Sequence, residues 1–140
     1  MADVAAAAEY AAAAGLPFDA SELSEERPVF YVTFSNRKGE LFHAEIRCDH
    51  YPKHPPTVEF VDADRKRRGT RDLYPGCFHD TPCVCARYNR KAYKAHGGPH
   101  EDWRLIDWML PTGGGVAIRN LREIVSDLHG KIAESEGRLG

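Results

Sequence analysis

Residues 51–60 read YPKHPPTVEF and decide the fold of this chain. The three prolines in this stretch can neither continue a helix nor pair in a central strand, because proline lacks an N–H group and its φ is fixed. The residues that precede the prolines are also restricted to extended geometry. We therefore predict a rigid, extended elbow that joins two strands.

Apolar and polar residues alternate on the amino-terminal side of this elbow. Residues 29–34 are mostly β-branched or aromatic, which is typical of a strand, and every second residue of 41–48 is apolar. These patterns predict an antiparallel meander with one face buried and the other in water. The side chains expected on the face that a C-terminal helix covers are Phe42, Ile46, Val58 and Phe60.

Helices are expected at both ends of the chain. Residues 2–14 are alanine-rich and precede a glycine, which predicts a short helix that docks weakly, since it offers little large apolar surface. Apolar residues recur at helical spacing over 116–133 and predict a packing helix. Its buried stripe is expected to include Leu121, Val125 and Leu128. Together with the meander, these helices predict the α+β class.

The composition is that of an ordinary globular domain, with 140 residues, 42% of them hydrophobic and 29% charged. A net charge of −2 gives no electrostatic reason to expect nucleic acid as the main partner. No apolar run approaches the roughly 20 residues of a membrane helix. We expect one domain over residues 1–140, with a helix and connector (1–27), the meander (28–62), a cysteine-bearing loop region (63–115) and the packing helix with its tail (116–140).

The chain has four cysteines, and their setting is expected to be cytoplasmic. The first segment carries Asp3 and Glu9 but no basic leader, which is atypical of a secretion signal. In a reducing compartment, thiols bind metals or do chemistry rather than form structural disulfides. Cys48 falls on the apolar strand face and is interpreted as an inert core residue. The other cysteines lie in 73–98, a stretch without periodicity, and long irregular loops in compact domains are often functional.

Two further features of the loop region allow more than one interpretation. The five basic residues between positions 65 and 71 are interpreted as solvated loop surface, with a partner-docking patch as the alternative. The apolar residues Trp103, Leu105, Ile106 and Trp108 are interpreted as a packing cluster that covers the core rather than a binding platform.

The order of these features resembles the ubiquitin-conjugating enzyme (UBC-fold) family, in its short prokaryotic form. In that family a meander leads to a Tyr-Pro-x-x-Pro-Pro-x-Val-x-Phe segment, which residues 51–60 match. A loop then carries the catalytic cysteine, a tryptophan follows, and a helix packs behind the site. The resemblance covers residues 29–133. It implies a UBC-like fold whose cysteine carries the C-terminal carboxyl group of a partner protein as a thioester.

The sequence departs from the family's pattern at two places. The family has His-Pro-Asn shortly before its cysteine, and that asparagine stabilises an oxyanion, but the matching place here reads Tyr74-Pro75-Gly76. The family's two later helices have no counterpart before Gly140, so we expect a form without them. Short bacterial relatives encoded in antiviral defence (CBASS-like) operons are similar to this form. The resemblance therefore implies a role in bacterial antiviral defence.

The resemblance also implies candidate site residues. Cys85 is the expected thioester acceptor, because a β-branched apolar residue, Val84, precedes it as in the family. Cys83 is the alternative nucleophile or a redox neighbour. Asn89 is the candidate donor to the oxyanion, with a plain loop hydrogen bond as the alternative interpretation. Among His79, His96 and His100, His100 is the candidate base or amine-orienting residue, with an ordinary loop histidine as the alternative.

The partners that the resemblance implies are other proteins. The carried protein is expected to be a ubiquitin-like protein or a nucleotidyltransferase with a modified C-terminus. An adenylating activating enzyme would supply the acyl group. We expect no cofactor, and neither nucleic acid nor a membrane as a partner.

Two rival interpretations use the same loop. Cys77, His79, Cys83 and Cys85 supply three sulfurs and one imidazole, a set that suits tetrahedral Zn²⁺. A closed zinc site would leave no free nucleophile, so the domain would be a non-catalytic binding module of the same fold. Alternatively, Cys83 and Cys85 could form a strained disulfide that switches the thiol off.

Overall fold

The structure is a computed structural model, and it describes residues 2–111 and 117–140. The helices and strands in chain order are α1 (Ala2–Ala14), β1 (Phe18–Asp19), β2 (Val29–Ser35), β3 (Leu41–Arg47), β4 (Thr57–Val61) and α2 (Leu121–Ala133). Short 3-10 helices interrupt the loop region at η1 (Arg71–Leu73), η2 (Arg90–Ala92), η3 (Lys94–His96) and η4 (Leu105–Asp107). The prediction of the α+β class is confirmed.

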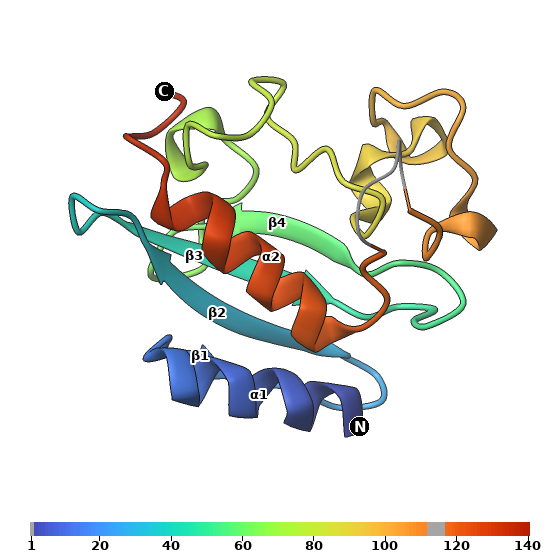
Figure 1. Cartoon of the computed structure of the whole chain (residues 1–140), viewed down its shortest axis with the longest axis horizontal. Helices are drawn as coiled ribbons and strands as arrows, with labels where there is room; N and C mark the ends of the chain where they lie inside the picture. Colours follow the sequence, from blue (N-terminus) through green and yellow to red (C-terminus); the bar gives the residue numbers. More distant parts are fainter. Residues whose placement is uncertain (1, 112–116) are drawn as a thin grey trace.

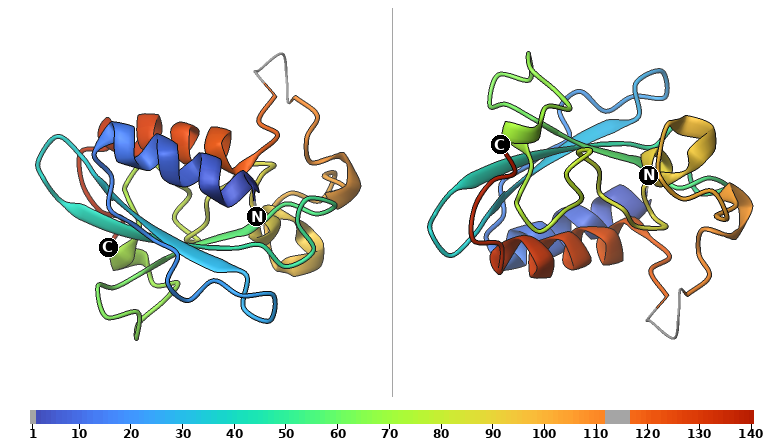
Figure 2. Two further views of the ribbon diagram at one scale, coloured as in Figure 1. Left: turned by 90° about the horizontal axis from the view of Figure 1, so that it is seen from below. Right: turned by 90° about the horizontal axis from the view of Figure 1, so that it is seen from above.

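In the described chain, the strands form one antiparallel sheet in the order β1-β2-β3-β4. The register of β2 on β3 runs from Val29 opposite Arg47 to Ser35 opposite Leu41. Both helices lie side by side on the same face of this sheet, and the later part of the loop region (86–111, yellow to orange) lies beyond one end of it (Figures 1 and 2). β1 lies in the segment that was expected to be an irregular connector; a strand of two residues is too short to show periodicity in the sequence.

The proline elbow joins β3 and β4, as predicted. The four side chains expected on the helix-covered face are at most 1% exposed and belong to the same core cluster as the α2 stripe. Within α2, Leu121, Val125 and Leu128 are fully buried, as expected. Burying one such leucine contributes about 1.5–3 kcal/mol relative to leaving it in water.

Helix α2 is shorter than predicted, because it begins at Leu121 rather than at position 116. Val116 itself lies outside the described residues. Asn120 has an extended backbone, with φ −148° and ψ 170°, and its side chain accepts a hydrogen bond from the Glu123 N–H group at 2.9 Å. This is an N-cap. The partly buried Ile118 continues the apolar spacing, but it precedes the cap.

Helix α1 is docked, contrary to the expectation that it would pack weakly. Ala7 and Ala11 are fully buried and Val4 is 5% exposed. The Tyr10 hydroxyl is hydrogen-bonded to His129 of α2 at 2.9 Å. Small side chains suffice here because they let the helix backbone approach its neighbours closely. Neither α1 nor α2 is long and apolar enough to cross a membrane, and the same holds for the other described helices.

The second face of the sheet is also covered, although it was expected to be in water. Glu45 on this face is fully buried, and Arg68 donates hydrogen bonds to its two carboxylate oxygens at 2.7 and 3.1 Å. Arg65 lies 3.4 Å over the ring of Tyr31 and pairs with Asp19 at 2.7 Å. The basic run after β4 therefore folds back over the sheet through Arg65 and Arg68. Lys66, Arg67, Arg68 and Arg71 still have exposed surface, in line with the interpretation as solvated loop surface.

Candidate active site

Cys85 lies in a short segment that backbone contacts fix to the core. Its neighbour Val84 is 1% exposed. On the other side, the backbones of His79 and Cys83 exchange hydrogen bonds of 3.2 and 3.0 Å, which closes a small loop. The chain turns at Cys85 itself, where the Ala86 N–H group donates to the Val84 carbonyl oxygen at 3.0 Å. These contacts leave the Cys85 side chain at a fixed, partly exposed position.

Asn89 is the main clamp of this segment. Its amide oxygen accepts hydrogen bonds from the backbone N–H groups of Val58 at 2.9 Å and Lys91 at 3.2 Å. Its amide nitrogen donates to the Val84 carbonyl oxygen at 2.9 Å. Asn89 is also fully buried. The expected role of Asn89 as an oxyanion donor therefore finds no support here, because its side chain joins β4 to the cysteine segment.

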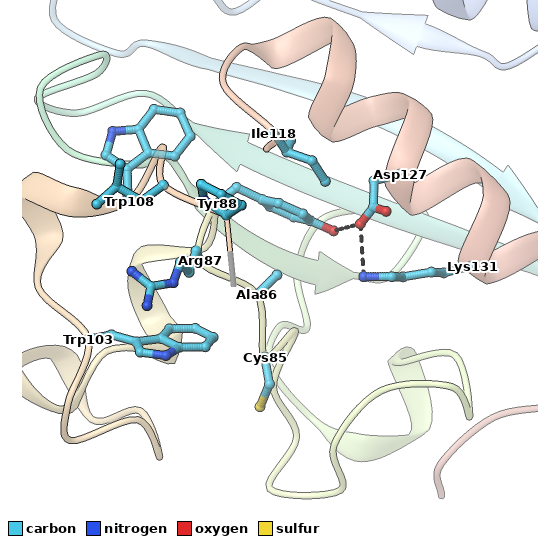
Figure 3. A pocket seen from close by; sticks show the side chains of 11 residues that line it. Cys85, Ala86, Arg87, Tyr88, Trp103, Trp108, Ile118, Asp127 and Lys131 are labelled. Atoms are coloured by element: carbon cyan, nitrogen blue, oxygen red, sulfur yellow. Dashed lines mark hydrogen bonds and ion pairs between the residues drawn. The ribbon is translucent and has the colours of Figure 1, made fainter. Parts of the chain in front are cut away.

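The Cys85 side chain lines a cleft of about 270 Å³. The cysteine segment forms one wall of the cleft, the loop at 103–111 contributes a second, and α2 contributes a third (Figure 3). Burial raises the pKa of the Cys85 thiol above its usual range, although the neighbouring Cys83 thiol donates a hydrogen bond that acts in the opposite direction. The resting thiol is therefore protonated at neutral pH.

Cys83 is a poorer candidate nucleophile than Cys85. It is 7% exposed, whereas Cys85 is partly exposed. Burial and the neighbouring Cys85 thiol raise the pKa of Cys83 to about 12. Cys48 is 5% exposed, and burial raises the pKa of its thiol to about 12 as well, as suits its interpretation as an inert core residue.

A hydrogen-bonded network from α2 faces the same cleft. The Tyr88 hydroxyl donates to Asp127 at 2.7 Å, and the Lys131 ammonium pairs with the same carboxylate at 2.9 Å (Figure 3). Burial and the charge of Asp127 hold the pKa of Tyr88 well above its ordinary value. Asp127 is thus committed to two donors, and Tyr88 stays protonated at neutral pH.

The opposite side of the cleft is built on Trp103. The guanidinium group of Arg87 lies 5.3 Å from the centre of the Trp103 ring system, within the range of a cation–π contact. His100 stacks on Trp103 with ring centroids 3.6 Å apart and planes 3° apart. His100 itself does not line the cleft. In the structure His100 therefore positions Trp103. Its expected role as a base, or as a residue that orients the incoming amine, stays a prediction.

The proline elbow reaches this site through Trp108. The Trp108 indole N–H group donates to the Pro52 carbonyl oxygen at 2.9 Å, and the indole is 2% exposed. Trp108 is thus a packing residue, as predicted, whereas Trp103 is only partly buried and forms part of a cleft wall. The prediction was wrong for Ile106, which is 64% exposed, while Leu105 packs against the core as expected. The elbow therefore supports the wall of the cleft as well as joining two strands.

The zinc set of Cys77, His79, Cys83 and Cys85 is not assembled. Within 2–111 and 117–140, no group of three or more His, Cys, Asp or Glu side chains is placed to hold a metal ion. His79 is exposed and hydrogen-bonds to Thr81 at 3.2 Å. Cys77 lies near Ser135, beyond the end of α2, and burial of its thiol raises the thiol pKa. The structure therefore lends the zinc alternative no support.

The segment 74–76, where the sequence resemblance would place an asparagine, is hydrogen-bonded to the C-terminal tail. The Gly76 N–H group donates to the Gly137 carbonyl oxygen at 2.7 Å, and the Leu139 N–H group donates to the Tyr74 carbonyl oxygen at 3.1 Å. This pairing holds the start of the cysteine loop against the tail. It supplies no side-chain amide at that position.

Searches against family models, curated proteins and solved structures gave no match to this chain. The assignment of function therefore depends on the geometry of the site and on the sequence features described above.

Several residues at the cleft escaped the sequence analysis. Asp127 and Lys131 are spaced as an i,i+4 acid–base pair on a predicted helix, so their contact with each other could have been found from the sequence. Their contact with Tyr88 could not, because it depends on how the irregular loop packs on α2. The same holds for the contact of Arg87 with Trp103.

Proposed function

We propose that this chain is a UBC-like transferase that carries the C-terminus of a partner protein as a thioester on Cys85 and passes it to an amine. One observation carries the proposal: Cys85 is partly exposed on the wall of a cleft, on a segment that Val84 and Asn89 anchor. A thiol in such a position can be reached by an extended chain end, whereas the buried Cys83 cannot.

The order of the elements supports the same proposal. A helix, an antiparallel meander, a proline elbow between β3 and β4, a cysteine-bearing loop and a packing helix follow one another. This is the order that the sequence resemblance to the UBC family implies. Trp108, which follows the cysteine in the chain, connects the elbow to the cleft, so the features of the resemblance meet at one place in the structure.

The proposed reaction has two steps. In the first, the Cys85 thiol loses its proton and its sulfur attacks the carbonyl carbon of a C-terminus that an adenylating enzyme has activated; the activating enzyme's thiol leaves. In the second, an amine attacks the same carbon, a C–N bond forms and the C–S bond breaks. The proton released by the amine returns to the sulfur, and Cys85 is ready again.

The setting we propose follows from the resemblance to short bacterial forms. The carried protein would be a ubiquitin-like protein or a nucleotidyltransferase, and the system would serve antiviral defence in the cytoplasm. Neighbouring genes for an adenylating enzyme and a nucleotidyltransferase would support this setting.

A synthetic peptide thioester tests the first step without knowledge of the natural partner. The protein is incubated with a short glycine-ended peptide carried as a mercaptoethanesulfonate thioester, and adducts are identified by intact mass and peptide mapping. We expect one hydroxylamine-labile adduct on Cys85, which is lost in Cys85→Ala and kept in Cys83→Ala. Cys77→Ala controls for reaction at Cys77, the most exposed cysteine residue of the described chain. Adducts that survive in Cys85→Ala, or none in the wild type, would refute the proposal.

The redox alternative is favoured by one observation, the closeness of the Cys83 and Cys85 thiols, each of which shifts the pKa of the other. A peroxide could remove two electrons and two protons from these thiols and leave a disulfide. If this pair acts as a switch, mild peroxide treatment lowers the protein mass by two hydrogens, blocks the Cys85 adduct, and is reversed by dithiothreitol. In Cys83→Ala no disulfide with Cys85 can form, so peroxide treatment should no longer give a block of the Cys85 adduct that dithiothreitol reverses.

A further inference from the structure

Arg87 carries a hydrogen-bonding group that is left without a partner. Its Nε atom is buried and has no hydrogen-bond partner among the described residues. Its Nη1 atom reaches only the Asp107 carbonyl oxygen at 3.5 Å, at the outer limit of a hydrogen bond. Buried polar groups are rarely left unpaired, so such a group calls for an explanation. Because Arg87 lines the cleft that holds Cys85, an entering ligand can supply the partner.

The charges around the cleft also leave Arg87 uncompensated. Two cations, Arg87 and Lys131, and one carboxylate, Asp127, line it. Lys131 pairs with Asp127 at 2.9 Å, so this carboxylate is already committed. The undescribed residues 112–116 are Thr, Gly, Gly, Gly and Val, and they carry no ionisable side chain. One positive charge, on Arg87, therefore remains for a ligand.

The size and lining of the cleft indicate what kind of ligand fits. At about 270 Å³ it lies just below the usual range of small-molecule pockets, about 300–1,000 Å³. It therefore suits a few residues of an extended chain rather than a folded surface. Trp103, Leu110 and Ile118 give the cleft apolar contact area. In Figure 3, Arg87 lies over Trp103 on one side, Asp127 and Lys131 lie on the other, and Cys85 lies below both.

We propose that Arg87 is a specificity residue that binds an acidic side chain within the last few residues of the carried protein's C-terminus. That the bound chain end is the C-terminus carried on Cys85 rests on the proposed function. A carboxylate suits a guanidinium group because two parallel N–H···O hydrogen bonds can form. Trp103 supports the guanidinium plane from below, which limits the rotamers that Arg87 can adopt. A chain end joined to Cys85 and lying along Trp103 reaches this group.

The test uses binding without acylation. Peptide amides of glycine and alanine carry a single Glu at each of the last four positions, and matched peptides carry Gln instead. Binding to the Cys85→Ala variant is followed by nuclear magnetic resonance titration. We expect one Glu position to bind about five- to tenfold more tightly than its Gln counterpart, with the preference weakening as salt rises. Equal binding of every Glu–Gln pair, or no binding of any peptide, would overturn the proposal.

Variants of Arg87 in the Cys85→Ala background decide whether this residue is responsible. Arg87→Gln should abolish the preference for Glu, and Arg87→Glu should transfer it to a Lys at the same position. Arg104→Gln is the matched control, since Arg104 is exposed on the following loop and does not line the cleft. A preference that persists in Arg87→Gln would refute the assignment. If these two variants fail to fold, Arg87→Lys replaces them. It keeps the positive charge but cannot form two parallel N–H···O hydrogen bonds, so the preference for Glu should become weaker.

The two proposals fail separately. If peptides with Glu bind more tightly but no thioester forms on wild-type Cys85, the peptide site at Arg87 is supported and the transferase proposal is refuted. If the Glu and Gln peptide thioesters acylate Cys85 at equal rates, the transferase proposal is supported and the specificity role of Arg87 is refuted.

Discussion

At the scale of single residues, the burial of the Cys85 thiol decides how the proposed reaction has to run. Burial raises the pKa of this thiol, and no charged group of the described chain offsets that shift. The thiolate is a minor species at neutral pH but an intrinsically strong nucleophile, because nucleophilicity rises with pKa. The activation needed for acyl transfer must then come from the incoming thioester or adenylate rather than from a base beside the cysteine.

The raised pKa of Cys85 predicts a specific pH profile. The rate of its alkylation by iodoacetamide, followed by peptide mapping, should rise about tenfold per pH unit from neutral pH into the alkaline range. Cys83→Ala removes the donor that opposes the effect of burial, so the rate at Cys85 should fall at any fixed pH below the thiol pKa. Cys48→Ala, at a buried position directly after β3, should leave the profile unchanged. A plateau near neutral pH would indicate an activating base instead.

At the scale of elements, the loop after β4 closes the second face of the sheet. Arg68 reaches back to Glu45 of β3, and it also lies 3.7 Å from Glu59 of β4. Burial alone would raise the pKa of Glu45, but the hydrogen bonds and charge of Arg68 outweigh it and hold that pKa below the usual range. This interaction ties a loop of high charge to a particular place on the sheet.

Substitution of Arg68 should show how much its contact with Glu45 stabilises the fold. Arg68→Ala leaves a buried carboxylate short of donors and is expected to lower the free energy of unfolding by about 1–3 kcal/mol at neutral pH, measured by urea denaturation. Arg67→Ala, which breaks an exposed pair with Asp72, should have no measurable effect. If both variants lost the same free energy of unfolding, the contact of Arg68 with Glu45 would not account for the destabilisation.

The pH dependence of the Arg68→Ala effect follows from the direction of the Glu45 shift. A carboxyl group with a lowered pKa in the folded state contributes stability above its unfolded pKa, and that contribution is lost as the pH falls through the folded pKa. The difference between wild type and Arg68→Ala should therefore be largest at neutral pH and shrink in acid. A difference that grows in acid would contradict this assignment.

The sequence predicts elements better where they are periodic than where they are not. Alternation over β3 and the proline elbow correctly place Phe42 and Phe60 in the core, because period-two patterns report burial directly. The burial of Glu45 was missed, since a charged residue on an alternating strand normally faces water. For Asn89 a loop hydrogen bond was the alternative interpretation, but its partners Val58 and Val84 could not be named from the sequence, because the fold brings them to it.

At the scale of the whole molecule, both helices share one face of the sheet (Figure 1). The cleft lies where the loop region meets α2 (Figure 3). Helix α1 lies beside α2 and packs on the core through alanines. A helix of small residues is poor in apolar area, so its place depends on close approach rather than on large side chains. This explains why the low apolar area of the segment suggested weak docking from the sequence.

Close approach makes the buried face of α1 intolerant of larger side chains. Ala7→Leu should destabilise the protein by about 1–3 kcal/mol through overpacking. The exposed Ala5→Leu, which has nearly the same effect on helix propensity, should be close to neutral. Urea midpoints of the two variants provide the comparison. If Ala7→Leu proved stabilising, α1 would have to pack more loosely than its fully buried alanines indicate.

The stacking of His100 on Trp103 gives the cleft an optical signal of its own. Trp103 lies in the cleft wall with its indole stacked on His100, so a peptide that covers this wall changes the surroundings of the indole. The chain has only one other tryptophan, Trp108, which is 2% exposed. Entry of a peptide along Trp103 should therefore change the intrinsic fluorescence, and Trp103→Phe should remove the change. Occupancy of the cleft could then be followed in real time without any label.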